Sequence, residues 1–148
     1  MAKVLISLIG TGKQASGDDK NNKYETTDYV LENTLYENMT FTSNAIIQHF
    51  DIDRAYFVGT NKSMWDNLVE KFGGNEDYQL EILEKKDNGN LSENDLSELN
   101  KLLDEKLGSS GSKCYIVKDG ENEAELWAIF EKFLDILDNV NKKLNFRT

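Results

Sequence analysis

The sequence contains no proline, one cysteine and one histidine among its 148 residues. The single Cys114 excludes an internal disulfide, and its place inside an apolar run predicts a reduced core thiol in a cytoplasmic protein. The single His49 falls in a predicted helix with no second ligand-type residue beside it, which favours a structural role and excludes a Ser-His-Asp set. The absence of proline, together with many Asn and Lys, indicates a compositional bias of the genome and says nothing about function.

Long apolar runs and an excess of positive charge are also lacking. No run approaches the length of a membrane span, and the N-terminus enters a strand directly, without the basic and apolar regions of a signal peptide. We therefore expect a soluble, cytoplasmic protein with no membrane partner. The net charge of −10 argues against duplex nucleic acid as a general partner, because nonspecific affinity comes from neutralising phosphates. A small phosphorylated ligand in a local basic, glycine-lined pocket remains compatible with that charge.

The first apolar run, Lys3 to Ile9, has no polar interruption except Ser7 and is rich in β-branched residues. Such a run predicts a strand buried on both faces, which is typical of a central parallel strand. The segment from Gly10 to Lys13 (GTGK) follows at once. Ligands bind at the carboxyl ends of the strands in open parallel sheets, so this loop is a candidate site.

A second segment of the same design lies downstream, where Arg54 to Val58 precedes Gly59-Thr60-Asn61-Lys62-Ser63. Two strands that each end in Gly-Thr and a lysine predict two loops that converge on one anionic ligand. A single loop of this kind is better explained as a tight turn, whereas two at adjacent strand ends favour a phosphate or ribose site.

The remaining pattern predicts an α/β protein: a Rossmann-like doubly wound, mostly parallel sheet with an inserted β-hairpin, in one domain over residues 1–148. Thr42 or Ser43, Ser63, and Ser92 with Asp95 are predicted helix caps. Further strands are expected at 24–31, 34–36, 113–117 and from 144, and helices at 42–50, 64–72, 92–107 and 122–140, with 78–84 unassigned.

Two familiar nucleotide motifs are weak or absent. Residues 10–15 (GTGKQA) match the dinucleotide fingerprint formally, but the polar residues that follow do not continue as the helix that the fingerprint requires. The Gly-Lys-Ser/Thr spacing of a P-loop is missing. No cluster of metal-ligand residues stands out, so we expect no metal and no cofactor.

Four stretches carry a resemblance to a known family: KVLISLIGTG at 3–12, YETTDY at 24–29, VGT followed by SMWD within 58–66, and ELWAIF at 125–130. Together they resemble the CARF family (CRISPR-associated Rossmann fold), most closely the branch found in type III CRISPR effectors. The likeness spans nearly the whole chain in the same order.

The resemblance implies a homodimer that binds one cyclic oligoadenylate across its two-fold axis, and a two-fold site suits a ring with an even number of nucleotides. By position, two loops carry over as ligand-binding. They are Gly10, Thr11, Gly12 and Lys13, and Thr60, Asn61, Lys62 and Ser63.

The chain departs from that family after the last predicted strand. There the branch usually has a segment resembling Asp-Ile-Thr-His-Gly-Phe-Arg-Ser and then an effector domain, often a HEPN ribonuclease, whereas here only Arg147 and Thr148 follow Phe146. The expectation is a sensor or sponge without RNA cleavage. A ring nuclease, with Thr11, Lys13 and Ser63 as catalytic residues, and a generic nucleotide-binding Rossmann domain are the alternatives.

Overall fold

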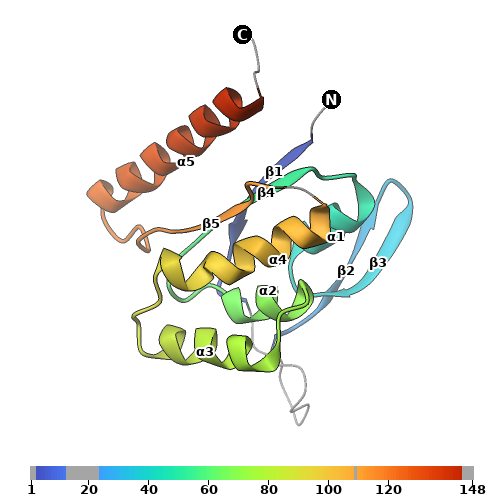
Figure 1. Ribbon diagram of the computed structural model, residues 1–148, viewed down its shortest axis with the longest axis horizontal. Helices are drawn as coiled ribbons and strands as arrows, with labels where there is room; N and C mark the ends of the chain where they lie inside the picture. Colours follow the sequence, from blue (N-terminus) through green and yellow to red (C-terminus); the bar gives the residue numbers. More distant parts are fainter. Residues whose placement is uncertain (1–2, 13–23, 109, 145–148) are drawn as a thin grey trace.

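The computed structural model describes residues 3–12, 24–108 and 110–144 (Figure 1). Its centre is a parallel sheet of β1 (Val4–Ile9), β4 (Arg54–Gly59) and β5 (Lys113–Ile116), in the order β1-β4-β5. Ile9 pairs with Gly59, and Gly59 with Ile116, so the three strands end level with one another. The three carboxyl ends therefore form one edge.

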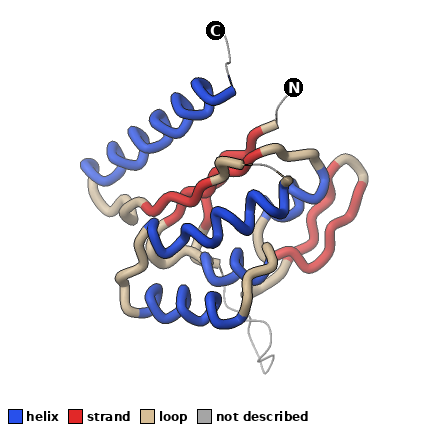
Figure 2. The backbone as a smooth tube through the Cα atoms, viewed as in Figure 1, coloured by secondary structure: helices blue, strands red, loops and turns tan. Residues whose placement is uncertain are grey.

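Helices cover both faces of this sheet. On one face lie α1 (Thr42–His49), α2 (Trp65–Lys71) and α4 (Ser97–Leu107), with α3 (Glu76–Asp87) packed on α2. The long α5 (Glu123–Leu144) is the one described helix on the other face (Figure 2). This arrangement confirms the predicted doubly wound α/β fold.

The alternation of side chains along β4 explains why both faces are covered. Ala55 and Phe57 belong to the core beneath α1, α2 and α4, whereas Tyr56 and Val58 contact the α5 side. All four are at most 1% exposed. Successive strand residues point to opposite faces, so a strand that is apolar on both faces, as β4 is from residue 55 to 58, must be covered twice.

The predicted position of the first strand within the sheet was wrong. β4 is the central strand, and β1 lies at an edge of the sheet among the residues described. Leu8 of β1 is 66% exposed. An uninterrupted apolar run indicates burial on two faces, but it carries no information about which neighbour supplies the edge hydrogen bonds.

The inserted hairpin is confirmed as β2 (Thr27–Leu31) and β3 (Thr34–Met39), which form a separate two-stranded sheet. Glu32 and Asn33 form its turn with φ of 49° and 69°, as two-residue hairpin turns require. His49 of α1 holds the hairpin, because its Nδ1 lies 2.7 Å from the Tyr36 hydroxyl and its Nε2 lies 3.2 Å from a Glu32 oxygen. The sole histidine thus has a structural place.

Two predicted helix caps were wrong. α1 begins after Phe41 and α2 after Met64, and neither helix has a side-chain cap. The hydroxyls of Ser43 and Ser63 instead bind Ser7 and the Ile9 carbonyl of β1. Tertiary partners on the sheet have replaced the local N-terminal bonds that a serine usually makes.

Other helix predictions fared differently. Ser92 and Asp95 form the predicted capping box, which starts the short 3-10 helix η1 (Glu93–Leu96) that leads into α4. The unassigned segment 78–84 lies inside α3. Leu144 belongs to α5 and does not start a strand, and residues 145–148 lie outside the described part of the chain. No described helix is both long enough and apolar enough to cross a membrane.

Candidate functional site at the carboxyl edge of the sheet

The loops that follow β1 and β4 lie side by side and are hydrogen-bonded to each other. The Met64 amide donates to the Gly10 carbonyl at 3.0 Å, and the Ser63 hydroxyl donates to the Ile9 carbonyl at 2.6 Å. The expected convergence of the two Gly-Thr loops is therefore present in the fold. Lys13, which was predicted to complete the first loop, lies outside the described residues.

Gly10, Thr11 and Gly12 form an exposed ridge after β1. Gly12 has φ +72°, and a Cβ there would lie 2.7 Å from the Cδ1 atom of Tyr24 and 3.0 Å from the Cε atom of Met64. Glycine thus permits both the left-handed backbone and the close passage over the Tyr24 ring. Among the described residues, the Thr11 hydroxyl makes one long contact of 3.5 Å, to the Gly12 carbonyl, and Thr11 is exposed.

The loop after β4 is held from within. Ser63 is 1% exposed, and its oxygen also accepts from the Thr60 amide at 2.9 Å. The Trp65 indole donates to the Thr60 carbonyl at 2.8 Å, and the Asn61 amide donates to the Leu91 carbonyl at 3.1 Å. Ser63 therefore organises the two loops from beneath, and a direct contact between its hydroxyl and a ligand stays a prediction.

Lys62 is the cation that this second loop presents to solvent. Its side chain is exposed and forms no ion pair with any described residue. In a chain of net charge −10, such a lysine provides a local positive potential at the strand ends.

A third loop, after β5, was missed by the sequence predictions. Val117 continues the ladder by donating from its amide to the Gly59 carbonyl at 2.8 Å, and Lys118 and Asp119 follow. A cavity of about 310 Å³ is lined by Asn61 of the second loop and by Lys118, Asp119 and Glu125. The rule that favoured the first two loops, applied to the end of strand 113–117, would have selected Lys118 as well.

A buried charged cluster lies beneath the first two loops. Asp66 is 2% exposed and accepts from the Tyr24 hydroxyl at 2.7 Å and from Lys86 of α3 at 3.0 Å. Burial, reinforced by the Asp66 carboxylate, raises the pKa of the Tyr24 phenol far above its usual range, so Tyr24 remains a neutral donor. This paired arrangement satisfies a carboxylate that would otherwise be costly to bury.

No local sequence pattern identifies that cluster. Asp66 is separated by 42 residues from Tyr24 and by 20 from Lys86. Asp66 is the last residue of the SMWD stretch, and Lys86 lies two residues after segment 78–84, for which the sequence pattern predicts no element. The meeting of these residues depends on how α2 packs against α3.

The carboxyl edge of the sheet carries groups that can contact an anion. Two exposed lysines, Lys62 and Lys118, and the glycine-rich backbone ridge lie there, and Asp119 and Glu125 line the same cavity as Lys118. Within the part of the chain that is described, no three His, Cys, Asp or Glu side chains are grouped so that they could hold a metal.

Comparisons with known proteins link the chain to CRISPR systems. It is 34% identical to "CRISPR-associated protein MJ1674" of Methanocaldococcus jannaschii over an alignment of 158 positions. The alignment includes 95% of this chain but 25% of the relative, so the chain spans about a quarter of that protein's length. No protein-family model and no solved structure matches the chain.

Proposed function

We propose that this chain is a CRISPR-associated module that binds a cyclic oligoadenylate, with cyclic tetra-adenylate the first candidate and cyclic hexa-adenylate the second. The observation that carries the proposal is the pair of hydrogen-bonded Gly-Thr loops at the carboxyl edge of a parallel sheet. The similarity to a CRISPR-associated protein supports it, as does the resemblance of the same loops to CARF domains. In this role the chain is a sensor or sponge for a second messenger of type III CRISPR antiviral defense.

The physical basis is a division of tasks at the edge. The Thr11 hydroxyl and the backbone of Gly10 to Gly12 face solvent, where phosphate and ribose oxygens can meet them. Lys62 and, from outside the described residues, Lys13 supply positive charge. Ser63 holds the two loops together, because its hydroxyl accepts from the Thr60 amide and donates to the Ile9 carbonyl of β1.

The decisive experiment is calorimetry of the same protein sample with four ligands: cyclic tetra-adenylate, cyclic hexa-adenylate, NAD and ATP. Submicromolar binding of a cyclic oligoadenylate, with NAD and ATP at least a hundredfold weaker, is the expected result. Tighter binding of NAD or ATP would replace the proposal with a generic nucleotide-binding Rossmann domain.

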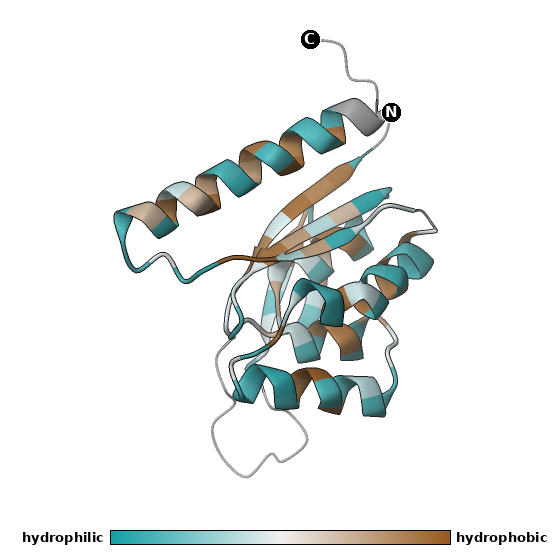
Figure 3. Ribbon diagram, turned by 60° about the vertical axis from the view of Figure 1, so that its left-hand side comes forward, coloured by the Kyte–Doolittle hydropathy of each residue, from teal (hydrophilic) through white to brown (hydrophobic). Residues whose placement is uncertain are grey.

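We also propose a homodimer, because a two-fold ring is contacted symmetrically by two copies of one loop set. α5 offers apolar surface for it on the side away from its buried Ile136 and Val140. Brown segments recur along much of this helix in Figure 3. Five large apolar side chains on it are 49–58% exposed: Leu126, Trp127, Phe130, Leu134 and Leu137. Light scattering at micromolar protein, with and without ligand, tests this, and a monomer in both states would contradict it.

A second candidate activity is slow, metal-independent cleavage of the ring. A ribose 2′-oxygen would attack the adjacent phosphorus, the 5′-oxygen would leave and take up a proton, and a 2′,3′-cyclic phosphate would remain. The exposed Thr11 hydroxyl favours this candidate, since it is free to orient a ribose. Lys13 would neutralise phosphate charge, and Ser63, which is buried, would act by holding the loops.

The cleavage test uses excess protein, cyclic tetra-adenylate and EDTA. Linear products that end in a 2′,3′-cyclic phosphate and disappear in Thr11→Ala or Lys13→Ala would establish a ring nuclease. An intact ring after several hours would leave the binding role alone.

A further inference from the structure

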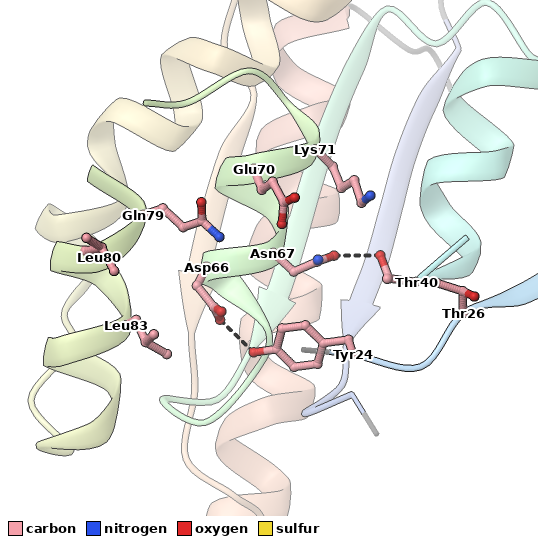
Figure 4. A pocket seen from close by; sticks show the side chains of 10 residues that line it. All are labelled: Tyr24, Thr26, Thr40, Asp66, Asn67, Glu70, Lys71, Gln79, Leu80 and Leu83. Atoms are coloured by element: carbon pink, nitrogen blue, oxygen red, sulfur yellow. Dashed lines mark hydrogen bonds between the residues drawn. The ribbon is translucent and has the colours of Figure 1, made fainter. Parts of the chain in front are cut away.

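A second cavity lies beside the Gly12 loop, between α2, α3 and the segments around Tyr24 and Thr40 (Figure 4). Its volume is about 190 Å³, roughly that of six water molecules at about 30 Å³ each. Polar side chains enter from α2 and α3, and Leu80 and Leu83 of α3 add apolar wall. None of the functions discussed above uses this cavity.

The most informative side chain in this cavity is Asn67. It is 5% exposed, and its Oδ1 accepts from the Thr40 hydroxyl at 2.6 Å. That bond turns the oxygen toward Thr40 and leaves the amide nitrogen without a hydrogen-bond partner among the described residues. A buried donor with no partner is costly, which indicates that an acceptor occupies the cavity in the working protein.

The other polar groups complete a pattern of donors and acceptors. Glu70 lies one turn after Asn67 on α2 and presents a carboxylate, which can only accept hydrogen bonds. Gln79 reaches across from α3, and its side-chain amide, which both donates and accepts, has no partner among the residues described. A donor beside an acceptor, with a further amide opposite, matches the edge of a nucleobase.

The charges on the wall of this cavity are of both signs and give it no excess of positive charge to attract a phosphate. Glu70 and Lys71 of α2 both line it, and the buried Asp66 is already paired with Lys86. A neutral base is tolerated there, whereas phosphates are better placed at Lys62 and Lys118 on the carboxyl edge. The two environments are contiguous, because the Tyr24 ring that lines the cavity lies directly beneath Gly12.

We propose that the cavity between α2 and α3 is an adenine site, in which Asn67 donates to a ring nitrogen, Glu70 accepts from the exocyclic amine and Gln79 binds the remaining edge. Leu80, Leu83 and the Tyr24 ring contact the faces of the base. The choice of adenine among the bases rests on the proposed function, since the expected ligand contains no other base.

Adenosine alone is the probe for the test, measured by NMR on the full chain labelled with ¹⁵N. Its addition should shift the side-chain amide signals of Asn67 and Gln79 saturably, and guanosine, cytidine and uridine should shift them less. Gln79→Ala should weaken adenosine binding at least fivefold, because it removes a base contact from a half-exposed position without disturbing the core. The matched control is Gln48→Ala on the exposed side of α1, which should bind as the wild type does.

The outcomes separate the two proposals. No adenosine response at millimolar concentration, or the same affinity in Gln79→Ala, overturns the adenine site. If cyclic tetra-adenylate binds the wild type and Gln79→Ala equally, the proposed function stands and the adenine site fails. If adenosine binds at Asn67 and Gln79 but no cyclic oligoadenylate binds, the adenine site stands and the proposed function fails.

Discussion

The loop after β4 and the loop after β1 meet at one edge of the sheet, yet they are built in opposite ways. Thr60 to Ser63 is tied down by a buried hydroxyl, an indole N–H and an Asn amide. Gly10 to Gly12 is exposed and has few side-chain bonds. The loop after β4 is hydrogen-bonded from within and supports its neighbour, and the exposed ridge with Lys62 is where we propose that a ligand binds. The same Gly-Thr pattern therefore serves two purposes.

The largest expected effect comes from removing Trp65, the main internal support of the β4 loop. Trp65 is fully buried, and its indole bonds the Thr60 carbonyl. Trp65→Ala should lower the free energy of unfolding by about 3–5 kcal/mol, measured by urea denaturation followed by circular dichroism. Thr11→Ala, on the β1 ridge, should stay within about 0.5 kcal/mol of wild type. Similar losses in both variants would remove the contrast between the loops.

Ser63 tests the hydrogen bonds that join the two loops. Ser63→Ala leaves the Ile9 carbonyl and the Thr60 amide each without a side-chain partner. We expect a loss of about 1–3 kcal/mol in the free energy of unfolding, together with weaker ligand binding. Ser97→Ala, at an exposed position that starts α4, is the control and should change little. An unchanged free energy of unfolding in Ser63→Ala would show that the loops do not depend on this hydroxyl, which would then be available to contact a ligand.

Lys62 tests the other half of the comparison, a residue that should contribute to ligand binding and not to the stability of the fold. Lys62→Ala should weaken cyclic tetra-adenylate binding about tenfold or more, in line with about 1.5–3 kcal/mol for a charge-assisted contact, and should leave the melting temperature unchanged. The same result is expected for Lys13→Ala. Lys101→Ala, an exposed lysine of α4, controls for net charge alone. Unchanged affinity in Lys62→Ala and Lys13→Ala would place the ligand elsewhere.

The smallest effect concerns acid pH, which should weaken the segment that the β4 loop contacts through the bond from Asn61 to the Leu91 carbonyl. Asp95 forms the capping box with Ser92, the residue after Leu91, and a hydrogen bond from Lys85 lowers the pKa of Asp95. A carboxyl with a lowered folded pKa stabilises the protein above its unfolded value of about 3.9, and that stabilisation is lost as the pH falls through the folded pKa. Asp95→Asn should therefore melt lower than wild type at pH 7, and the difference should shrink below about pH 4. A constant difference down to pH 2.5 would contradict this assignment.

Sequence pattern was sufficient where a single local cause decides the structure. Continuous apolar runs predicted β1, β4 and β5, and the turn after Leu31 separated β2 from β3. The capping box at Ser92 and Asp95 formed as predicted, because both of its partners lie within one turn. The two Gly-Thr loops could be paired because the carboxyl ends of neighbouring parallel strands lie at the same edge of a sheet.

The sequence pattern failed where the partner of a residue lies far away in the sequence. Ser63 has the sequence position of a helix cap, but its hydroxyl donates to the carbonyl of Ile9 in β1. α3 was not recognised because Tyr78 and Ile82 are its only buried residues, too few to make a clear helical stripe. The pairing of Asp66 with Lys86 joins two helices and leaves no periodic trace in the sequence.

By itself the sequence determined the fold class, the inserted hairpin and the two glycine loops, since each follows from local periodicity or from residues that only a turn accommodates. Tertiary structure decided that β4 is the central strand, that the Ser63 hydroxyl is hydrogen-bonded to the Ile9 carbonyl and that Lys118 lies at the carboxyl edge of the sheet. It also created the cavity between α2 and α3, where Asn67 is buried beside Thr40. These features depend on which surfaces meet when the sheet and helices pack, and side-chain alternation does not encode that choice.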